Sequence, residues 1–276
     1  MNKKSYGRKV KKQVGRLLTE TNRDGALAKL KEIPNEQLVG HLFFHFYHRD
    51  ELIKFRSITA MGLLCARIAE KNMEQARIVL RRIMWNLNDE SGGIGWGSPE
   101  AMGEILCQNI RLATEFKSIL FSYLDPDENF IEHEMLQRGV IWGIGSYLSA
   151  FPIDLTEKTK GLLFGYLQSP DAVKIGYAIR ALVNANNFDG RLVPESILSD
   201  QSQIDIFSGW NFYRTKISDM ALACDRQAPG CGVLYGILSD SGYRLLNPAQ
   251  KEKHAHEKKG WWNHSNGKGN IEKTSD

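Results

Sequence analysis

A ten-residue pattern recurs four times in the first two thirds of the chain. The four windows are residues 53–62 (IKFRSITAMG), 94–103 (IGWGSPEAMG), 136–145 (LQRGVIWGIG) and 173–182 (VKIGYAIRAL), and they start 41, 42 and 37 residues apart. Self-similarity at a period of roughly 20 to 50 residues is typical of proteins built from one repeated supersecondary unit. This repeat is the sequence feature that most constrains the fold.

Each window has the spacing of one helical face. An aliphatic residue opens the window, a small or medium residue follows four positions later, and an apolar residue stands eight positions after the first. An apolar-rich segment precedes each window, at residues 42–47, 78–87, 119–124 and 162–167. Two apolar stripes in each repeat predict a pair of helices, and the fold class is predicted to be all-α.

The aliphatic residue, the basic or polar residue after it and the Ala-Leu-Gly-like closure resemble the second helix of HEAT repeats, in the variant also seen in phycobilisome lyase-type repeats. The resemblance covers residues 35–187. It implies an α-α superhelix, a HEAT-like solenoid with an armadillo-like helical arrangement. The basic residue is present as Lys54 and Lys174, but the other two windows have Gly95 and Gln137, so those repeats are expected to pack less regularly.

The segments that flank the repeats differ from them in sequence pattern. Residues 1–34 are expected to supply one or two helices that cover the apolar face of the first repeat, because a terminal repeat cannot leave its apolar face exposed to water. Residues 188–246 are expected to form a β-hairpin around Ser208 and Gly209, followed by a helix capped by Thr215. Residues 247–276 are predicted to be a disordered polar tail.

Composition limits the classes of protein that remain. No apolar run is long enough to cross a bilayer, so we expect a cytoplasmic protein without a membrane partner. The net charge is only +4 and the excess basic residues lie near the two ends, which favours a protein partner over nucleic acid. Reduced thiols are expected for the four cysteines, although Cys224 and Cys231 leave a disulfide or half of a metal site open.

The third and seventh residues of each window are predicted to point away from the core. These residues are Phe55 and Thr59, Trp96 and Glu100, Arg138 and Trp142, and Ile175 and Ile179. Stacked repeats would align them as a ridge of aromatic and charged side chains along a binding groove. In the alternative interpretation, loops or the C-terminal hairpin cover Trp96 and Trp142, which then extend the core.

The segment 86–100 (NLNDESGGIGWGSPE) is the most distinctive loop. It brings Asp89, Glu90 and Trp96 close together in the sequence and contains no phosphate-binding motif. The cluster of His41, His45 and His48 is expected to be structural, and the pair of His133 with Glu134 lacks the register of HEAT-fold di-iron hydroxylases. No cofactor and no metal are therefore predicted.

These patterns favour a non-catalytic scaffold that binds a protein or peptide. The predicted contact residues are Phe55, Asp89, Glu90, Trp96, Glu100, Arg138 and Trp142. One enzymatic alternative is similar to the HEAT-like alkylpurine DNA glycosylases, in which Trp96, Trp142, Glu100 and Arg138 would act on a damaged base. The other is similar to the bilin lyases, in which a tryptophan-lined groove would hold a flat tetrapyrrole.

Overall fold

The four repeat windows fall on alternate helices in the computed structural model. Three windows lie wholly within α4 (Glu51–Lys71), α8 (Glu134–Ala150) and α10 (Ala172–Asn184). The second window enters α6 (Ser98–Gln108) only at its fifth residue, because Gly97 precedes the helix with a left-handed φ of 72°. We call α4, α6, α8 and α10 the repeat helices.

The protein is mostly helical, with one small antiparallel sheet, and the structure describes residues 3–88, 94–188 and 192–223. The other elements are α1 (Lys3–Thr19), α2 (Arg23–Lys31), α3 (Asn35–His45), α5 (Met73–Asn88), α7 (Ile110–Ser122), η1 (Pro152–Asp154), α9 (Glu157–Gly165), η2 (Tyr166–Gln168), α11 (Glu195–Leu198), β1 (Gln203–Ser208), β2 (Asn211–Lys216) and α12 (Ile217–Ala223). All belong to one compact unit, Met1–Tyr243, and a second unit, Arg244–Asp276, lies outside the described residues.

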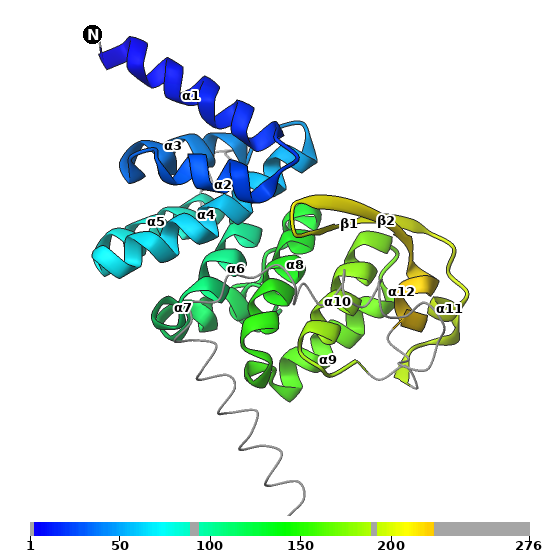
Figure 1. Cartoon of the computed structure of the whole chain (residues 1–276). Coiled ribbons are helices and arrows are strands. Elements are labelled where there is room, and N and C mark those ends of the chain that lie inside the picture. Colours follow the sequence, from blue (N-terminus) through cyan, green and yellow to red (C-terminus); the bar gives the residue numbers. More distant parts are fainter. Residues whose placement is uncertain (1–2, 89–93, 189–191, 224–276) are drawn as a thin grey trace, which may run out of the picture. The chain divides into compact units, whose positions relative to one another are not determined.

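The repeat helices pack against one another in sequence order. Figure 1 shows α4 beside α6, α6 beside α8 and α8 beside α10. The remaining helices of the repeats pack on this row: α3 on α4, α5 on α4 and α6, α7 on α6 and α8, and α9 on α10. Each repeat thus contributes a pair of helices, as the two apolar stripes predict.

Glycines allow the repeat helices to approach closely. A Cβ atom on Gly103 of α6 would lie 2.2 Å from the carbonyl oxygen of Gly143 of α8, and a Cβ on Gly62 of α4 would lie 2.8 Å from the carbonyl oxygen of Glu104. No side chain could occupy these positions without moving the backbone opposite. The three helices therefore meet through backbone contacts, and the glycine that closes the first three windows has a packing role.

Two helices, α1 and α2, precede the first repeat. The apolar side of α1 consists of Val10, Val14, Leu17 and Leu18, and all four side chains are buried. This side faces the helices with which α1 packs, which are α2, α3 and α4. Figure 1 shows α1 and α2 at the end of the row that starts with α4.

The predicted hairpin is present. Strands β1 and β2 pair in antiparallel register from Gln203 with Lys216 to Ser208 with Asn211, and Gly209 turns the chain with φ of 66°. The following helix, α12, starts at Ile217, so Thr215 is not the residue directly before it as predicted, because Thr215 and Lys216 still pair with β1.

The side chains of Cys65 and Cys107 are buried, and burial raises the pKa of the Cys65 thiol. The thiols Cys224 and Cys231 and the predicted tail 247–276 lie outside the described residues. Within the part of the chain that the structure describes, no helix has both the length and the apolar character that a bilayer crossing requires.

The glycine contact between α6 and α8 can be tested by substitution. We expect Gly103→Ala to lower the free energy of unfolding by about 1–3 kcal/mol, because the new methyl group meets backbone that cannot rotate away. Gly161→Ala in α9 is the matched control. Its Cβ meets nothing within 4 Å, so the higher helix propensity of alanine should raise the free energy of unfolding by up to about 1 kcal/mol. Urea unfolding measures the free energy of unfolding of both variants. Equal effects of the two substitutions would contradict the close backbone approach of α6 to α8 at Gly103.

Candidate functional site

The hairpin covers part of the predicted ridge. The Phe55 ring lies 5.1 Å from the ring of Trp142, 5.2 Å from that of Phe207 on β1 and 5.3 Å from that of Phe212 on β2. Phe55 is 3% exposed and Trp142 is 1% exposed. The expectation that Phe55 and Trp142 stand on an open ridge is therefore wrong, and the alternative in which the C-terminal hairpin extends the core applies.

Most other residues predicted to point outward are also buried. This group consists of Thr59, Glu100, Ile175 and Ile179. On α10 the cause is visible at Gly176, where a Cβ atom would lie 2.0 Å from Ile204 Cδ1 of β1. Helical periodicity identifies the face that packs on the neighbouring helices, but it does not reveal that a hairpin far along the chain covers the opposite face.

A buried arginine that the sequence analysis missed fastens the hairpin to the helices. Arg56 of α4 is 2% exposed and donates hydrogen bonds to the carbonyl oxygens of Trp210 (2.8 Å) and Leu18 (2.9 Å) and to Asn211 Oδ1 (3.3 Å). Because these acceptors satisfy the guanidinium, its burial is tolerated. The only signal in the sequence was an arginine inside an apolar window, which does not identify its partners.

A second buried arginine has the same role between α8 and α10. Arg180 donates to the Trp142 carbonyl oxygen (3.1 Å) and to Ser146 Oγ (3.2 Å). Its guanidinium carbon lies 4.7 Å from the centre of the Trp142 ring. Trp142 is therefore enclosed by Phe55 on one helix and Arg180 on another, which explains why the indole is not available at the surface.

Glu100 lies in a buried polar cluster. Its carboxylate is 3.9 Å from Lys54 Nζ, and a Cβ on Gly139 would come within 2.6 Å of its Oε2 atom. Glu100 Oε2 is buried without a hydrogen-bond partner among the described residues. Burial raises the pKa of Glu100, and the positive charge of Lys54 opposes this effect only in part.

Arg138 retains the exposure that the prediction requires. Its side chain is 32% exposed, and its Nε donates to Asp171 Oδ2 at 2.6 Å. Asp171 caps α10 by accepting from the backbone N–H groups of Val173 and Lys174. The cap thus fixes the carboxylate that in turn orients the guanidinium.

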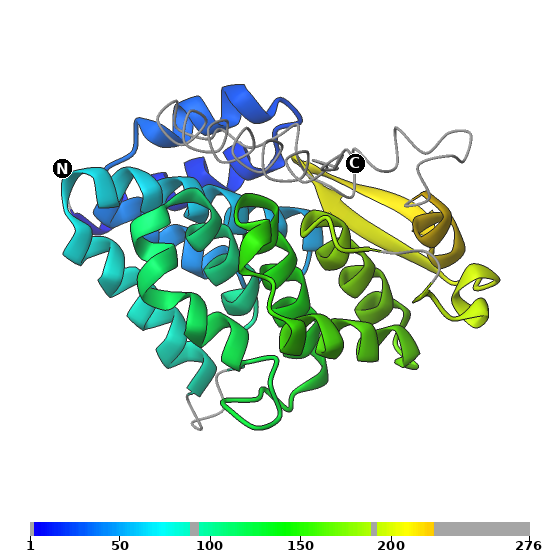
Figure 2. The same cartoon turned by 90° about the horizontal axis from the view of Figure 1, so that it is seen from below.

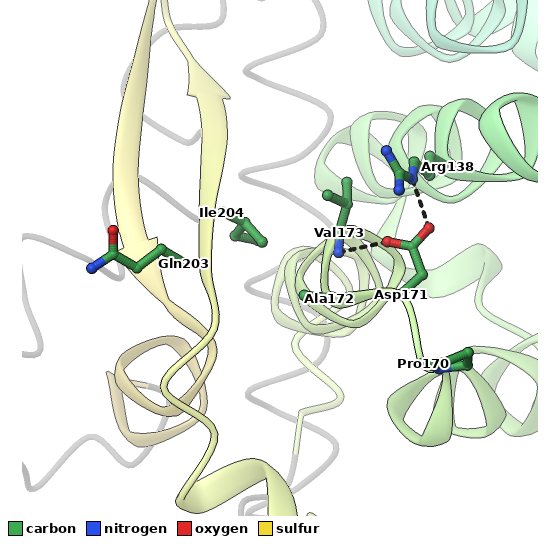
Figure 3. A pocket seen from close by; sticks show the side chains of 7 residues that line it. All are labelled: Arg138, Pro170, Asp171, Ala172, Val173, Gln203 and Ile204. Carbon is green, nitrogen blue, oxygen red and sulfur yellow. Dashed lines mark hydrogen bonds and ion pairs between the residues drawn. The ribbon is translucent and has the colours of Figure 1, made fainter.

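Arg138 and Asp171 line a pocket of about 470 Å³ beside strand β1. The other lining residues are Pro170, Ala172, Val173, Gln203 and Ile204. In Figure 3 the ion pair lies on one side of the pocket and β1 on the other, with Val173 and Ile204 as apolar walls. Figure 2 shows the hairpin beside α10, which is how a strand comes to complete a pocket on the helices.

Trp96 is half-buried in the segment before α6. Its ring meets the ring of His133 edge to face at 5.4 Å, and His133 caps α8 by accepting from the Met135 N–H at 3.2 Å. No described contact joins Trp96 to Arg138. The predicted acidic residues Asp89 and Glu90 lie outside the described residues.

The histidines and acidic groups do not gather into a metal site within the described residues. His45 is 5% exposed, and its Nδ1 donates to the His41 carbonyl oxygen at 2.7 Å. Burial is the main cause that lowers the pKa of His45, so the neutral ring is favoured. This arrangement agrees with the structural role expected for the cluster.

Comparison with known proteins adds one distant relative. A protein from Archaeoglobus fulgidus, described as uncharacterized, is 27% identical over 191 residues, which is 69% of this chain and 95% of that protein. No protein-family model matches the chain. No solved structure matches it either.

The pKa shift of Glu100 predicts a pH-dependent effect of Glu100→Gln. A raised pKa in the folded state means that the unfolded protein ionises first, so this group costs stability as pH rises above its ordinary value of about 4.5. The Gln variant does not lose this stability, because its side chain does not ionise. We therefore expect its unfolding free energy, measured relative to the natural protein by urea titration, to increase from about pH 4 to pH 7.

Glu115→Gln provides a control with the opposite sign. The hydrogen bond from Arg77 lowers the pKa of Glu115, so this carboxylate stabilises the fold above its ordinary pKa and the contribution disappears as pH falls. The Glu115→Gln variant should therefore have a lower free energy of unfolding than the natural protein at pH 7 and the same free energy of unfolding in acid. The same pH trend in both variants would rule out the buried, poorly partnered state of Glu100.

Proposed function

We propose that this chain is a non-catalytic, HEAT-like repeat scaffold that binds a peptide segment of a partner protein. The resemblance of the windows to HEAT second helices supports the proposal, together with the packing of α4, α6, α8 and α10 in sequence order. Repeat proteins of this kind act by presenting a rigid surface, which requires no catalytic group.

The pocket beside Arg138 is the main support for the position of the binding site. Three separate elements, α8, the start of α10 and β1, contribute to it, so its shape depends on the completed fold. Among the described residues, Arg138 has a hydrogen-bond partner only at Nε, which leaves its Nη donors for an acceptor on a ligand. Val173 and Ile204 offer an apolar surface next to them.

This chemistry favours a peptide with a carboxylate next to an aliphatic side chain. A guanidinium recognises a carboxylate with two parallel hydrogen bonds, and the aliphatic group would cover Val173 and Ile204. Trp96 remains in the proposed contact surface because it is half-exposed. Phe55 and Trp142 no longer belong to it, because both side chains are buried.

The two enzymatic alternatives have less support. Both need an accessible tryptophan, either to stack on a flipped base or to line a groove for a flat tetrapyrrole. Trp142 is 1% exposed and enclosed by Phe55 and Arg180, so it offers no ring face to a ligand. Glu100, the candidate carboxylate of the glycosylase alternative, is also buried.

A peptide-display selection against the full chain tests the proposal. We expect enrichment of peptides with an acidic residue beside an aliphatic one. The selected peptides should bind Arg138→Ala at least tenfold more weakly, because their carboxylate loses its charged partner. Isothermal titration of one selected peptide measures the dissociation constants.

Arg214→Ala is the matched control. Arg214 is an exposed hairpin arginine that also forms an ion pair, with Asp205 at 2.9 Å, but it does not line the pocket. Its substitution should leave peptide affinity unchanged within about twofold. The proposal fails if no peptide is enriched, or if the two arginine variants weaken binding equally.

A further inference from the structure

The excess of positive over negative charge in this chain lies on a single helix. Residues 3–19, which form α1, contain seven lysines and arginines and no acidic residue. Since the whole chain has 36 basic and 32 acidic residues, the part outside α1 has 29 basic against the same 32 acidic. The positive net charge therefore originates from α1.

Four of the five basic side chains of α1 that are described as exposed form one stripe. Arg8, Lys9, Lys12 and Arg16 are exposed, and at 100° per residue they fall within a sector of about 100°. The buried residues Val10, Val14, Leu17 and Leu18 lie on the other side of the helix. We call these four basic residues the α1 stripe; at 1.5 Å per residue it extends about 12 Å along the helix.

The charges of the stripe have no acidic partner among the residues that the structure describes. None of its four side chains forms an ion pair with a described residue, whereas Lys54, Arg138 and Lys174 on the repeat helices each do. Like charges in a row repel one another, and the free energy falls when a polyanion binds and replaces the water around them. The stripe therefore has the electrostatic character of a phosphate-binding surface.

One exposed aromatic ring lies next to α1, and a second follows it three positions along the chain. Lys11 Nζ, also on α1, is 3.5 Å from the centre of the Phe44 ring on α3, which is 51% exposed. Tyr47, three residues further along the chain, is 49% exposed. Basic side chains that follow a phosphate backbone, with aromatic rings beside them on which bases stack, are the combination that single-stranded nucleic acids require.

From this arrangement we propose that the α1 stripe, with Phe44 and Tyr47, binds single-stranded nucleic acid. An anionic membrane would also attract the charges, but an interfacial helix must insert its apolar face into the lipid. In α1 that face packs on α2, α3 and α4. The apolar residues are thus already used by the fold, which favours a nucleic-acid backbone over a bilayer.

The test uses fluorescence anisotropy of a labelled 20-nucleotide oligo-dT with the full chain at several salt concentrations. We expect affinity to fall steeply with salt. The variant Arg8→Gln, Lys12→Gln, Arg16→Gln should bind at least tenfold more weakly at low salt. Its slope of log affinity against log salt should be smaller by about 2, because three phosphate contacts are lost at about 0.7 each.

A charge-matched control separates the stripe from net charge. Lys31→Gln, Lys71→Gln and Arg111→Gln remove three exposed basic residues that lie outside α1, and binding should stay within threefold. Phe44→Ala with Tyr47→Ala should weaken binding at least fivefold without changing the salt slope, because stacking releases no counterions. Circular dichroism melts should match the natural protein in the two Gln variants, since every substituted side chain is exposed.

Three results would overturn the proposal. The first is no salt-dependent binding of the oligonucleotide. The second is an equal loss of affinity in the stripe variant and in the charge-matched control. The third is stripe-dependent binding to vesicles of 70% phosphatidylcholine and 30% phosphatidylserine together with no binding of the oligonucleotide, which would assign α1 to a membrane surface instead.

Discussion

The close approach of α6 to α8 at Gly103 and Gly143 is the constraint on which the rest of the fold depends. With no side chain between the two backbones, the helices are held at a separation that larger residues would not permit. Gly62 allows a similar approach of α4 to α6. The row of repeat helices that results is narrow enough for one two-stranded hairpin to reach both α10, through Ile204, and α4, through Phe207 and Phe212.

Packing of the hairpin on the repeat helices buries charged side chains, and hydrogen bonds within the protein replace most of the contacts with water that these side chains lose. Arg56 and Arg180 donate mainly to backbone carbonyl oxygens, which accept hydrogen bonds without carrying a charge that would also need burial. Lys174 is 4% exposed and meets the Gln137 side chain at 2.5 Å. Glu100 is less well compensated: its partner, Lys54, is 3.9 Å away, and one carboxylate oxygen has no described hydrogen bond. Such a group costs stability, and this is why its pKa is raised.

The surface that remains for partners is divided between two regions of different chemistry. The pocket beside Arg138 combines one ion pair with apolar walls and is formed by elements from the second half of the chain. The α1 stripe is a row of exposed cations on the first helix that form no ion pair with a described residue. The two proposals place peptide binding at the first region and nucleic-acid binding at the second. Of the predicted ridge only Arg138 belongs to one of these regions, and burial of Phe55 and Trp142 leaves Trp96 as its one aromatic side chain that is partly exposed.

The sequence by itself determined the elements: the four windows predicted the repeat helices, and the clusters of glycine and aromatic residues predicted the hairpin. These signals are local, since helix periodicity and turn residues depend on neighbours a few positions away. The tertiary structure alone decided what covers each face. Phe55 and Phe207 are 152 positions apart, and nothing in either local pattern encodes their contact. The same holds for α1, whose lysines resemble terminal decoration in the sequence but form a stripe once its apolar side is buried, because a helix gains a fixed outward face only by packing on something else.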